Sequence, residues 1–400
     1  MRQDRQDYGV GLLFSTTGTY AALGQDGLDG ALMALDEVNS DPSLGFRLRA
    51  RIENPGGVIE RYHALCEDMI RRDGCRHVVG TITSLSRKEI IPAIEKHDAL
   101  LWYMCPYEGF ECSDNVVYTG ACPNQHIVPL FQHVLPRYGA RACLVGSNYI
   151  WGWEINRIAR ALIQPCGGEV LSERYLPLGS EDVGRIVAEI AQKKPDFILN
   201  NFVGTTSYAF FRAMRLLAEQ DPSFRPEIRP IVSCNLTECE LGLIGEAGIG
   251  HLSSAIWFEE AGGPENAAFV ARAKARLGGG RRPSAFFTGA YAAVRLLAEA
   301  IREAGTDDVA GVKPVLTARS FATPAGRLSI DPRTNHATLT PHLGRIAEGG
   351  RFDIIESAPE PMAPDPYLVH FDPDRLAALV AAARQAGDVP SSAPDARPTA

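Results

Sequence analysis

Short apolar runs and amphipathic segments follow one another along the chain and predict alternating β-strands and helices. The run at residues 9–14 is almost wholly apolar, as expected for a buried strand. After it, Leu28, Ala31, Leu35 and Val38 recur at three- and four-residue spacing, which predicts a helix with one buried face. Further strands are predicted over residues 46–52, 77–80 and 99–104, with helices between them.

The same alternation restarts in the middle of the chain. Strands are predicted over residues 142–146, 170–175, 197–199 and 231–232, and helices over residues 151–163 and 210–217. Alternating strands and helices favour parallel sheets covered by helices on both faces, so two such runs predict two doubly wound α/β lobes joined by hinge crossovers. Ligands of open sheets bind beyond the carboxyl ends of the strands, which predicts a shared crevice between the lobes.

The alternation breaks down in the last third of the chain, where we expect it to cross back between the lobes. Lobe 1 is assigned residues 8–121 plus 250–325, and lobe 2 residues 122–249 plus 326–372. A hairpin is predicted between strands at residues 326–330 and 339–346, with its turn at residues 331–335. The polar, proline-rich tail at residues 387–400 is expected to be disordered.

Charge and cysteine content narrow the class of protein. With 40 basic and 48 acidic side chains the formal charge is -8, which disfavours direct binding to nucleic acid. No window approaches the ~20 apolar residues that span a bilayer. The first residues enter a strand without a secretory signal, so we expect a cytoplasmic protein, or a periplasmic one if a signal was removed. Nine scattered cysteines, an odd number, suit a reducing compartment.

Motifs that carry catalytic chemistry are missing from the sequence. It contains no phosphate-binding Gly-x-x-x-x-Gly-Lys-Ser/Thr loop, no His-Glu-x-x-His or Gly-x-Ser-x-Gly motif, and no spacing typical of zinc sites. Cys105, which follows a predicted strand, is the one candidate nucleophile. No base can be placed beside it, so a small polarizable wall residue is the favoured interpretation. We therefore expect neither an enzyme nor a bound metal or cofactor.

Four segments of the chain carry a resemblance to a known family. They span residues 10–18, 79–88, 99–111 and 145–151, and the string Pro106-Tyr107-Glu108-Gly109-Phe110-Glu111 is the most specific piece. The chain resembles the AmiC-like amide-sensing regulators of bacterial aliphatic amidase operons over about residues 8–367. This resemblance implies a type I periplasmic binding protein fold, close to branched-chain amino-acid and short-chain amide or urea binding proteins.

The resemblance also assigns residues to a ligand site. Ser84 matches the family's serine that contacts the amide, and Tyr103 and Tyr149 match tyrosines of the pocket wall. Thr83 and Pro106 belong to the same segments and are expected in the site with them. A plain helix cap for Ser84 and a core position for Tyr103 are the alternatives.

Three positions depart from the family pattern. Trp151 and Ile82 stand where relatives have tyrosines, and Cys105 stands where they have a threonine. These changes remove or alter polar groups, which favours a ligand other than acetamide.

Lobe 2 contributes a second group of expected contacts. Gly204, Thr205 and Glu238 lie at predicted strand-to-helix junctions, where they would close over a ligand. Glu238 would pair with an amine if the ligand were an amino acid, or it is only a surface carboxylate in a first helical turn.

Three functions remain open at this point. The first, implied by the resemblance, is a cytoplasmic, self-associating sensor that sequesters an RNA-binding antiterminator until a small amide binds. The second is the solute-binding component of an ABC transporter for short amides, urea or branched-chain amino acids. The third, an enzyme that uses Cys105, is the least favoured.

Overall fold

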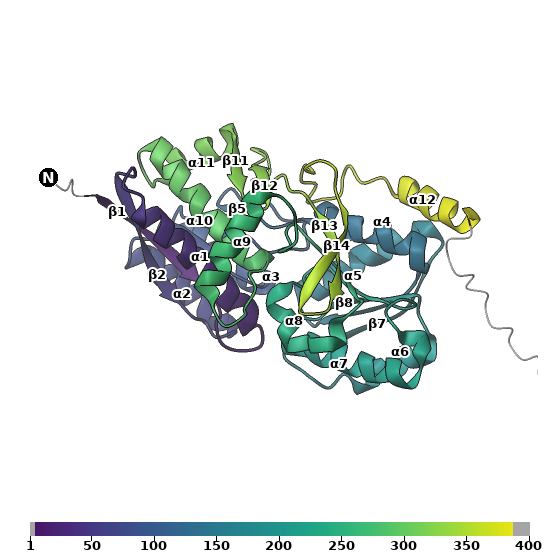
Figure 1. Cartoon of the computed structure of the whole chain (residues 1–400). Helices are drawn as coiled ribbons and strands as arrows, with labels where there is room; N and C mark the ends of the chain where they lie inside the picture. The colour runs from purple at the N-terminus through teal and green to yellow at the C-terminus, as the bar shows by residue number, and fades with distance from the viewer. Residues whose placement is uncertain (1–4, 387–400) are drawn as a thin grey trace, which may run out of the picture.

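The computed structural model describes residues 5–386, which form two α/β lobes lying side by side (Figure 1). Within these residues, lobe 1 carries a five-stranded sheet and lobe 2 a seven-stranded sheet. The predicted pair of doubly wound lobes is therefore confirmed. The tail expected to be disordered lies outside the described residues.

Lobe 1 is built on a parallel sheet with the strand order β2-β1-β3-β4-β5. The strands are β1 (Gln6–Leu13), β2 (Phe46–Glu53), β3 (His77–Gly80), β4 (Leu100–Tyr103) and β5 (Val116–Tyr118). The helices are α1 (Ala21–Ser40), α2 (Ile59–Arg71), α3 (Ser84–Lys96), α9 (Pro264–Leu277), α10 (Ala285–Ala304) and α11 (Val309–Ala318). A small hairpin of β11 (Ser320–Thr323) and β12 (Gly326–Ser329) follows α11. Every residue of β3 and β4 is buried, as expected for strands covered on both faces.

Two long helices of lobe 1, α1 and α10, pack closely because glycines let their backbones approach. A Cβ atom at Gly30 would lie 2.1 Å from the carbonyl oxygen of Phe287, and one at Gly24 would lie 1.9 Å from that of Ser15. These contacts fix the start of α1 and the loop before it, which borders the crevice between the lobes.

Lobe 2 has the strand order β14-β13-β10-β9-β8-β6-β7, parallel except at β13 and β14. The strands are β6 (Arg141–Ser147), β7 (Glu169–Leu176), β8 (Phe197–Asn201), β9 (Ile231–Ser233), β10 (Leu252–Ala255), β13 (His342–Ala347) and β14 (Arg351–Ser357). The helices are α4 (Ile127–Tyr138), α5 (Ile150–Ile163), α6 (Gly184–Lys193), α7 (Thr205–Gln220), α8 (Glu238–Ile244) and α12 (Pro373–Ala386). Short 3-10 turns are η1 (Pro123–Gln125), η2 (Gln164–Cys166), η3 (Pro222–Phe224) and η4 (Gly245–Gly248).

The chain leaves lobe 2 later than expected. The segment at residues 250–325 was assigned to lobe 1, but β10 pairs in parallel with β9 and antiparallel with β13. It therefore belongs to the lobe 2 sheet, and the return to lobe 1 comes after Ala255. Pairing on both sides satisfies the backbone groups of this buried strand, which its local sequence could not reveal.

The hairpin predicted between residues 326–330 and 339–346 is wrong, because the two strands do not pair with each other. β12 pairs with β11, whereas β13 joins the lobe 2 sheet. The predicted turn does form, but it closes only a single bridge between Ile330 and Ala337. Residues up to this turn therefore stay beside lobe 1, and the last crossing follows them (Figure 1).

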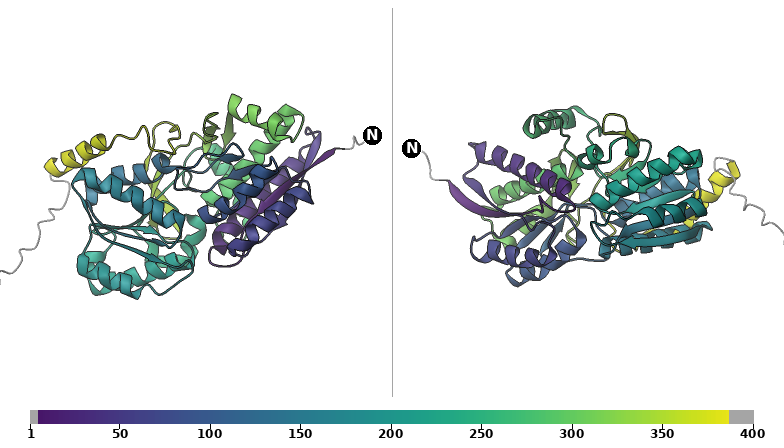
Figure 2. Two further views of the ribbon diagram at one scale, coloured as in Figure 1. Left: turned by 180° about the vertical axis from the view of Figure 1, so that it is seen from behind. Right: turned by 90° about the horizontal axis from the view of Figure 1, so that it is seen from below.

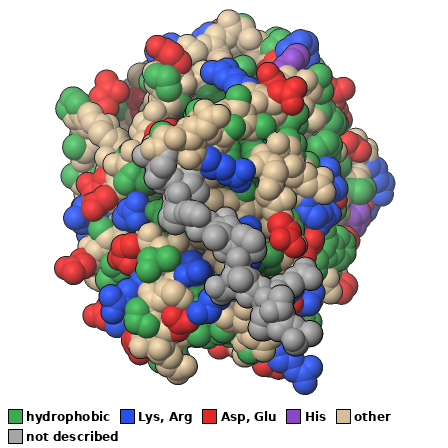
Figure 3. All heavy atoms as spheres, turned by 90° about the vertical axis from the view of Figure 1, so that its right-hand side faces the viewer, with side chains coloured by type: hydrophobic (Ala, Val, Ile, Leu, Met, Phe, Trp, Pro, Cys, Tyr) green, Lys and Arg blue, Asp and Glu red, His purple; other side chains and the backbone are tan. Residues whose placement is uncertain are grey.

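The lobes are in contact across their facing edges, as the views from behind and below show (Figure 2). Helix α1 of lobe 1 contacts α8 of lobe 2, and α3 contacts α5. At the far end of lobe 2, α12 packs on α4, and acidic and basic side chains are interspersed on that surface (Figure 3). The structure thus shows the two lobes closed on one another.

Candidate functional site

The start of α3 places three predicted site residues, Ile82, Thr83 and Ser84, at the carboxyl edge of the lobe 1 sheet. Thr83 caps the helix, because its hydroxyl accepts a hydrogen bond from the backbone N–H of Ser86. The Ser86 hydroxyl accepts one from the backbone N–H of Thr83 in return. Ser84 is the first helical residue and not the cap, so the cap alternative for Ser84 is wrong. The reciprocal bonds fix the backbone at Thr83, between Ile82 and Ser84.

A small cavity lies between the lobes at this edge. Lobe 1 lines it with Leu23, Ile82, Thr83, Ser84, Cys105, Pro106 and Phe286, and lobe 2 with Tyr149, Trp151, Val203 and Asn235. None of these lining side chains carries a formal charge. Side chains of both lobes line this narrow space, so only a small ligand would fit between the lobes in the closed form.

The aromatic pair of lobe 2 supplies hydrogen-bond donors to the cavity. Trp151 is 3% exposed, and its buried Nε1–H has no acceptor among the described residues. Burial and nearby acidic groups hold the pKa of Tyr149 well above its usual value, so its phenol stays neutral. An indole N–H can only donate, so the cavity calls for a ligand with an acceptor.

A buried ionic cluster lies behind Ser84. Arg87 is completely buried and donates to Glu108 at 2.9 Å and to Glu111 at 2.8 Å, and Lys88 donates to Glu111 at 2.6 Å. Burial opposes ionisation of Glu111, but the charges and hydrogen bonds of Arg87 and Lys88 outweigh it and lower its pKa to about 2. Two cations face two acidic side chains, so the cluster offers no free charge to a ligand.

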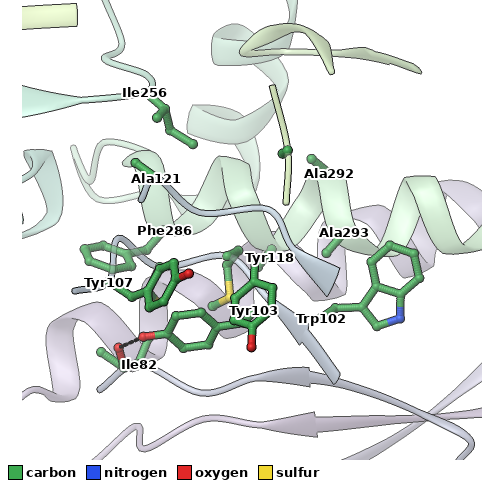
Figure 4. Close-up of a cluster of buried hydrophobic side chains, with 14 of the residues drawn as sticks. Ile82, Trp102, Tyr103, Tyr107, Tyr118, Ala121, Ile256, Phe286, Ala292 and Ala293 are labelled. Atoms are coloured by element: carbon green, nitrogen blue, oxygen red, sulfur yellow. Dashed lines mark hydrogen bonds between the residues drawn. The ribbon is translucent and has the colours of Figure 1, made fainter. Parts of the chain in front are cut away.

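Tyr103 belongs to this cluster and does not line the cavity. Its hydroxyl donates to the carbonyl oxygen of Ile82 at 3.2 Å, and its ring lies among buried side chains (Figure 4). The guanidinium of Arg87 is 4.7 Å from the ring centroid. These contacts favour the alternative considered for Tyr103, a core residue, which here positions the backbone before α3.

Gly204 and Thr205 lie where the lobes touch and not in the cavity lining. The backbone N–H of Thr205 donates to the carbonyl oxygen of Thr19 in lobe 1 at 3.2 Å. A Cβ atom at Gly204 would lie 2.1 Å from the same oxygen. Only glycine therefore permits this approach, and the contact acts as a latch on the closed form.

Glu238 lies in a second cavity, between α1 and α8. Its carboxylate accepts a hydrogen bond from the backbone N–H of Glu259 at 2.8 Å, and its Oε2 is buried without a partner. Asp26 of lobe 1 lines the same cavity; Ser284 donates to one of its oxygens, and the other has no hydrogen bond but lies 3.9 Å from the guanidinium of Arg281. Glu238, expected to close over a ligand, therefore does not line the interlobe cavity that contains Ser84, and it lies in a cluster that also contains Arg281.

The Asp26–Glu238 pair predicts that stability falls as pH rises. Burial raises the pKa of Asp26 to about 7 and that of Glu238 to about 8, above their ordinary values near 4. The folded chain then binds more protons than the unfolded chain between these limits, so the free energy of unfolding decreases from about pH 4 to about pH 8.

Glu238→Gln should remove part of this dependence. We expect the variant to gain about 1–3 kcal/mol over the wild type at pH 8.5, the size of an uncompensated buried polar group, and little at pH 5. Urea unfolding at both pH values measures the difference. An identical pH dependence in variant and wild type would show that Glu238 is not the titrating group.

Cys105 lines the ligand cavity as a thiol and not as a nucleophile. Its Sγ–H donates to the carbonyl oxygen of Thr81 at 3.3 Å. Burial raises the pKa of this thiol well above its usual value, so the reactive thiolate is disfavoured. The interpretation as a small wall residue is consistent with this environment.

Sequence reasoning missed four residues of the cavity lining. Asn235 follows the predicted strand at residues 231–232, and Val203 precedes Gly204, so their strand-end positions were signals that could have been used. Leu23 and Phe286 start helices α1 and α10, and only the packing of these helices brings them to the crevice.

The described residues contain no group of three or more acidic, histidine or cysteine side chains placed to hold a metal ion. In the same part of the chain, no helix has the length and apolar character needed to span a membrane.

Solved structures of known proteins have the same fold. A solute-binding protein of an ABC transporter from Rhodopseudomonas palustris HaA2, in complex with p-hydroxybenzoic acid, superposes with a TM-score of 0.80 at 21% identity, covering 92% of this chain and 100% of that chain. A leucine-binding protein from Thermotoga maritima gives a TM-score of 0.74 at 17% identity, covering 88% and 98%.

Sequence comparisons point the same way. The Leu/Ile/Val-binding protein homolog 6 of Brucella abortus is 23% identical over 291 residues, which cover 71% of this chain and 73% of the relative. A family model described as a periplasmic binding protein domain matches residues 8–373. Since this match spans well over half of the sequence, the chain belongs to the periplasmic binding protein family.

Proposed function

We propose that the chain is the solute-binding component of an ABC transporter and captures a small, uncharged amide between its lobes. The observation that carries the proposal is the interlobe cavity, which offers neutral polar groups and aromatic walls but no free charge. An ionised ligand would need a compensating charge in such a buried site, whereas a neutral amide needs only a donor and an acceptor.

The comparisons support the transport function more than a regulatory one. The similar folds include ABC transporter solute-binding proteins in complex with p-hydroxybenzoic acid and 3,4-dihydroxybenzoic acid, and the Brucella relative is named as a Leu/Ile/Val-binding protein homolog. The rings of p-hydroxybenzoic acid and 3,4-dihydroxybenzoic acid are planar, and a planar group would also suit the walls formed here by Tyr149 and Trp151. Members of this family are binding proteins, which agrees with a function without catalysis.

Binding acts by shifting the population of open and closed forms. The ligand contacts α3 of lobe 1 and α5 of lobe 2 at once, so it binds the closed form more tightly than the open form. Closure then presents one fixed arrangement of the two lobes to a membrane permease. The permease can distinguish ligand-bound from empty protein by this arrangement.

One observation favours a second candidate, a cytoplasmic amide sensor that self-associates and controls an RNA-binding antiterminator. All nine cysteines are unpaired, and seven of them are buried. Free cysteines persist in a reducing compartment. Fractionation of the native host's cells separates the candidates, because the transport component must lie outside the cytoplasmic membrane and the sensor inside it.

A thermal-shift panel tests the proposal. The probes are propionamide, butyramide, benzamide, urea, leucine and benzoate. At ~100 times its dissociation constant, a ligand of the native state raises the melting temperature of a 400-residue chain by about 3 °C. We expect a shift with the amides, reduced in Ser84→Ala and Tyr149→Phe and retained in Trp153→Phe, which changes an exposed residue of α5. Shifts with leucine or benzoate alone would contradict a neutral ligand.

A further inference from the structure

A second, small chamber lies next to the ligand cavity, near the segments where the chain crosses between lobes. The two spaces share Pro106, Asn235 and Phe286 as walls.

His126, the N-cap of α4, presents an unused acceptor in this chamber. The residue is fully buried, and its Nε2 lies 2.9 Å from the carbonyl oxygen of Tyr107. Since a carbonyl can only accept, Nε2 carries the proton. Burial lowers the pKa of His126 to about 4, so the ring is neutral and Nδ1 keeps a free lone pair. That atom is buried without a partner among the described residues.

Trp151 supplies the complementary donor. Its ring lies 5.8 Å from the ring of His126, centroid to centroid, and its buried Nε1–H also lacks a partner. One group is a donor only and the other an acceptor only. A hydroxyl group or a primary amide nitrogen and oxygen can satisfy both, whereas a methyl group or a lone carboxylate cannot.

Two other polar side chains around the chamber already have partners. The Ser254 hydroxyl donates to the carbonyl oxygen of His126 at 3.0 Å, and the Asn235 amide donates to the carbonyl oxygen of Phe202 at 3.4 Å. An unsatisfied buried acceptor disfavours the folded state by roughly 1–3 kcal/mol, so an occupant that meets both His126 and Trp151 is favoured.

We propose that His126 and Trp151 form a second subsite of the ligand cleft, which binds a hydroxyl group at the far end of the ligand. This inference rests on the proposed function and names the ligand class more narrowly: a small amide that carries a distal hydroxyl. Trp151 Nε1 donates to the hydroxyl oxygen, and the hydroxyl donates to His126 Nδ1.

Calorimetric titration with benzamide and 4-hydroxybenzamide tests the subsite. We expect the wild type to bind the hydroxylated compound about 10-fold or more tightly, since a site built to pair a hydroxyl discriminates against its absence. His126→Phe should bring the ratio of dissociation constants near one while changing benzamide affinity by less than about threefold, because His126 does not line the first cavity. Trp151→Phe should also bring the ratio near one, but it should weaken benzamide binding as well, because Trp151 lines the first cavity. Trp153→Phe, which alters an exposed tryptophan, should keep the preference.

The outcomes separate the subsite from the proposed function. If benzamide binds the wild type but the hydroxyl confers no preference, or if both variants retain the preference, the subsite is wrong and the amide site stands. If neither compound binds the wild type, the amide site fails and the subsite with it. Thermal unfolding of each variant without ligand shows whether it is folded.

Discussion

Replacing Gly204 with alanine should weaken ligand binding by on the order of 100-fold while leaving the protein folded. A Cβ atom at this position would lie 2.1 Å from the carbonyl oxygen of Thr19, a backbone atom of the opposite lobe that cannot move aside without separating the lobes. The variant therefore destabilises the closed form specifically. Calorimetric titration of the strongest ligand from the thermal-shift panel measures the loss.

Gly245 provides a matched control for this substitution. Gly204 has φ 64° and ψ −135°, and Gly245 has φ 64° and ψ −147°, so alanine strains the backbone similarly at both positions. A Cβ atom at Gly245, however, meets no other atom within 4 Å. Gly245→Ala should lose stability to the same strain but keep its ligand affinity within about threefold. Equal affinity losses in the two variants would contradict the latch.

Arg87→Met should destabilise the protein by about 3–5 kcal/mol, the effect of removing one partner of a buried ion pair. The substitution leaves Glu108 and Glu111 without their main cation, in a site where Arg87 is completely buried. It also removes the guanidinium that lies 4.7 Å from the rings of both Tyr103 and Tyr107. Urea denaturation measures the change in the free energy of unfolding.

The same chemical change on the surface serves as the control. Arg174 donates to both carboxylate oxygens of Glu189 at 2.7 Å and 2.8 Å, but its side chain is 51% exposed. Arg174→Met should therefore cost less than about 1 kcal/mol. Arg87→Lys should fall between the two, because it keeps the charge but loses the forked geometry and the stacking. A similar, small effect at both arginines would show that the cluster behind Ser84 is not structurally important.

The fold was predictable because each lobe repeats a local pattern. The apolar run of β1 and the stripe of α1 report burial directly, and parallel sheets follow from the alternation of such elements. The partners of β10 and β13 could not be predicted in this way. Both strands are short and contain polar residues, and their partners are set by long-range pairing of β10 with β9 and with β13.

The candidate site, like the fold, was predictable from the sequence only in part. Ile82, Ser84, Cys105, Tyr149 and Trp151 lie just beyond the carboxyl ends of strands, and the sheets bring such positions together at one edge. Chemistry that depends on long-range packing was not accessible from the sequence. Tyr103 also lies at the carboxyl end of a strand, yet its ring packs against the guanidinium of Arg87 in the core and does not line the cavity. The free acceptor atom of His126, Nδ1, can be identified only from the structure, because the structure shows that Nε2 is bonded to the carbonyl oxygen of Tyr107.

Small-angle X-ray scattering with and without ligand tests most directly the claim that the chain binds a small ligand by closing its two lobes. The ligand is the compound that gives the largest thermal shift in the panel. We predict that it lowers the radius of gyration of the wild type and of Gly245→Ala, and that Gly204→Ala keeps its ligand-free value at the same concentration. A ligand that stabilises the wild type without changing its radius of gyration, or that compacts Gly204→Ala equally, would contradict the account.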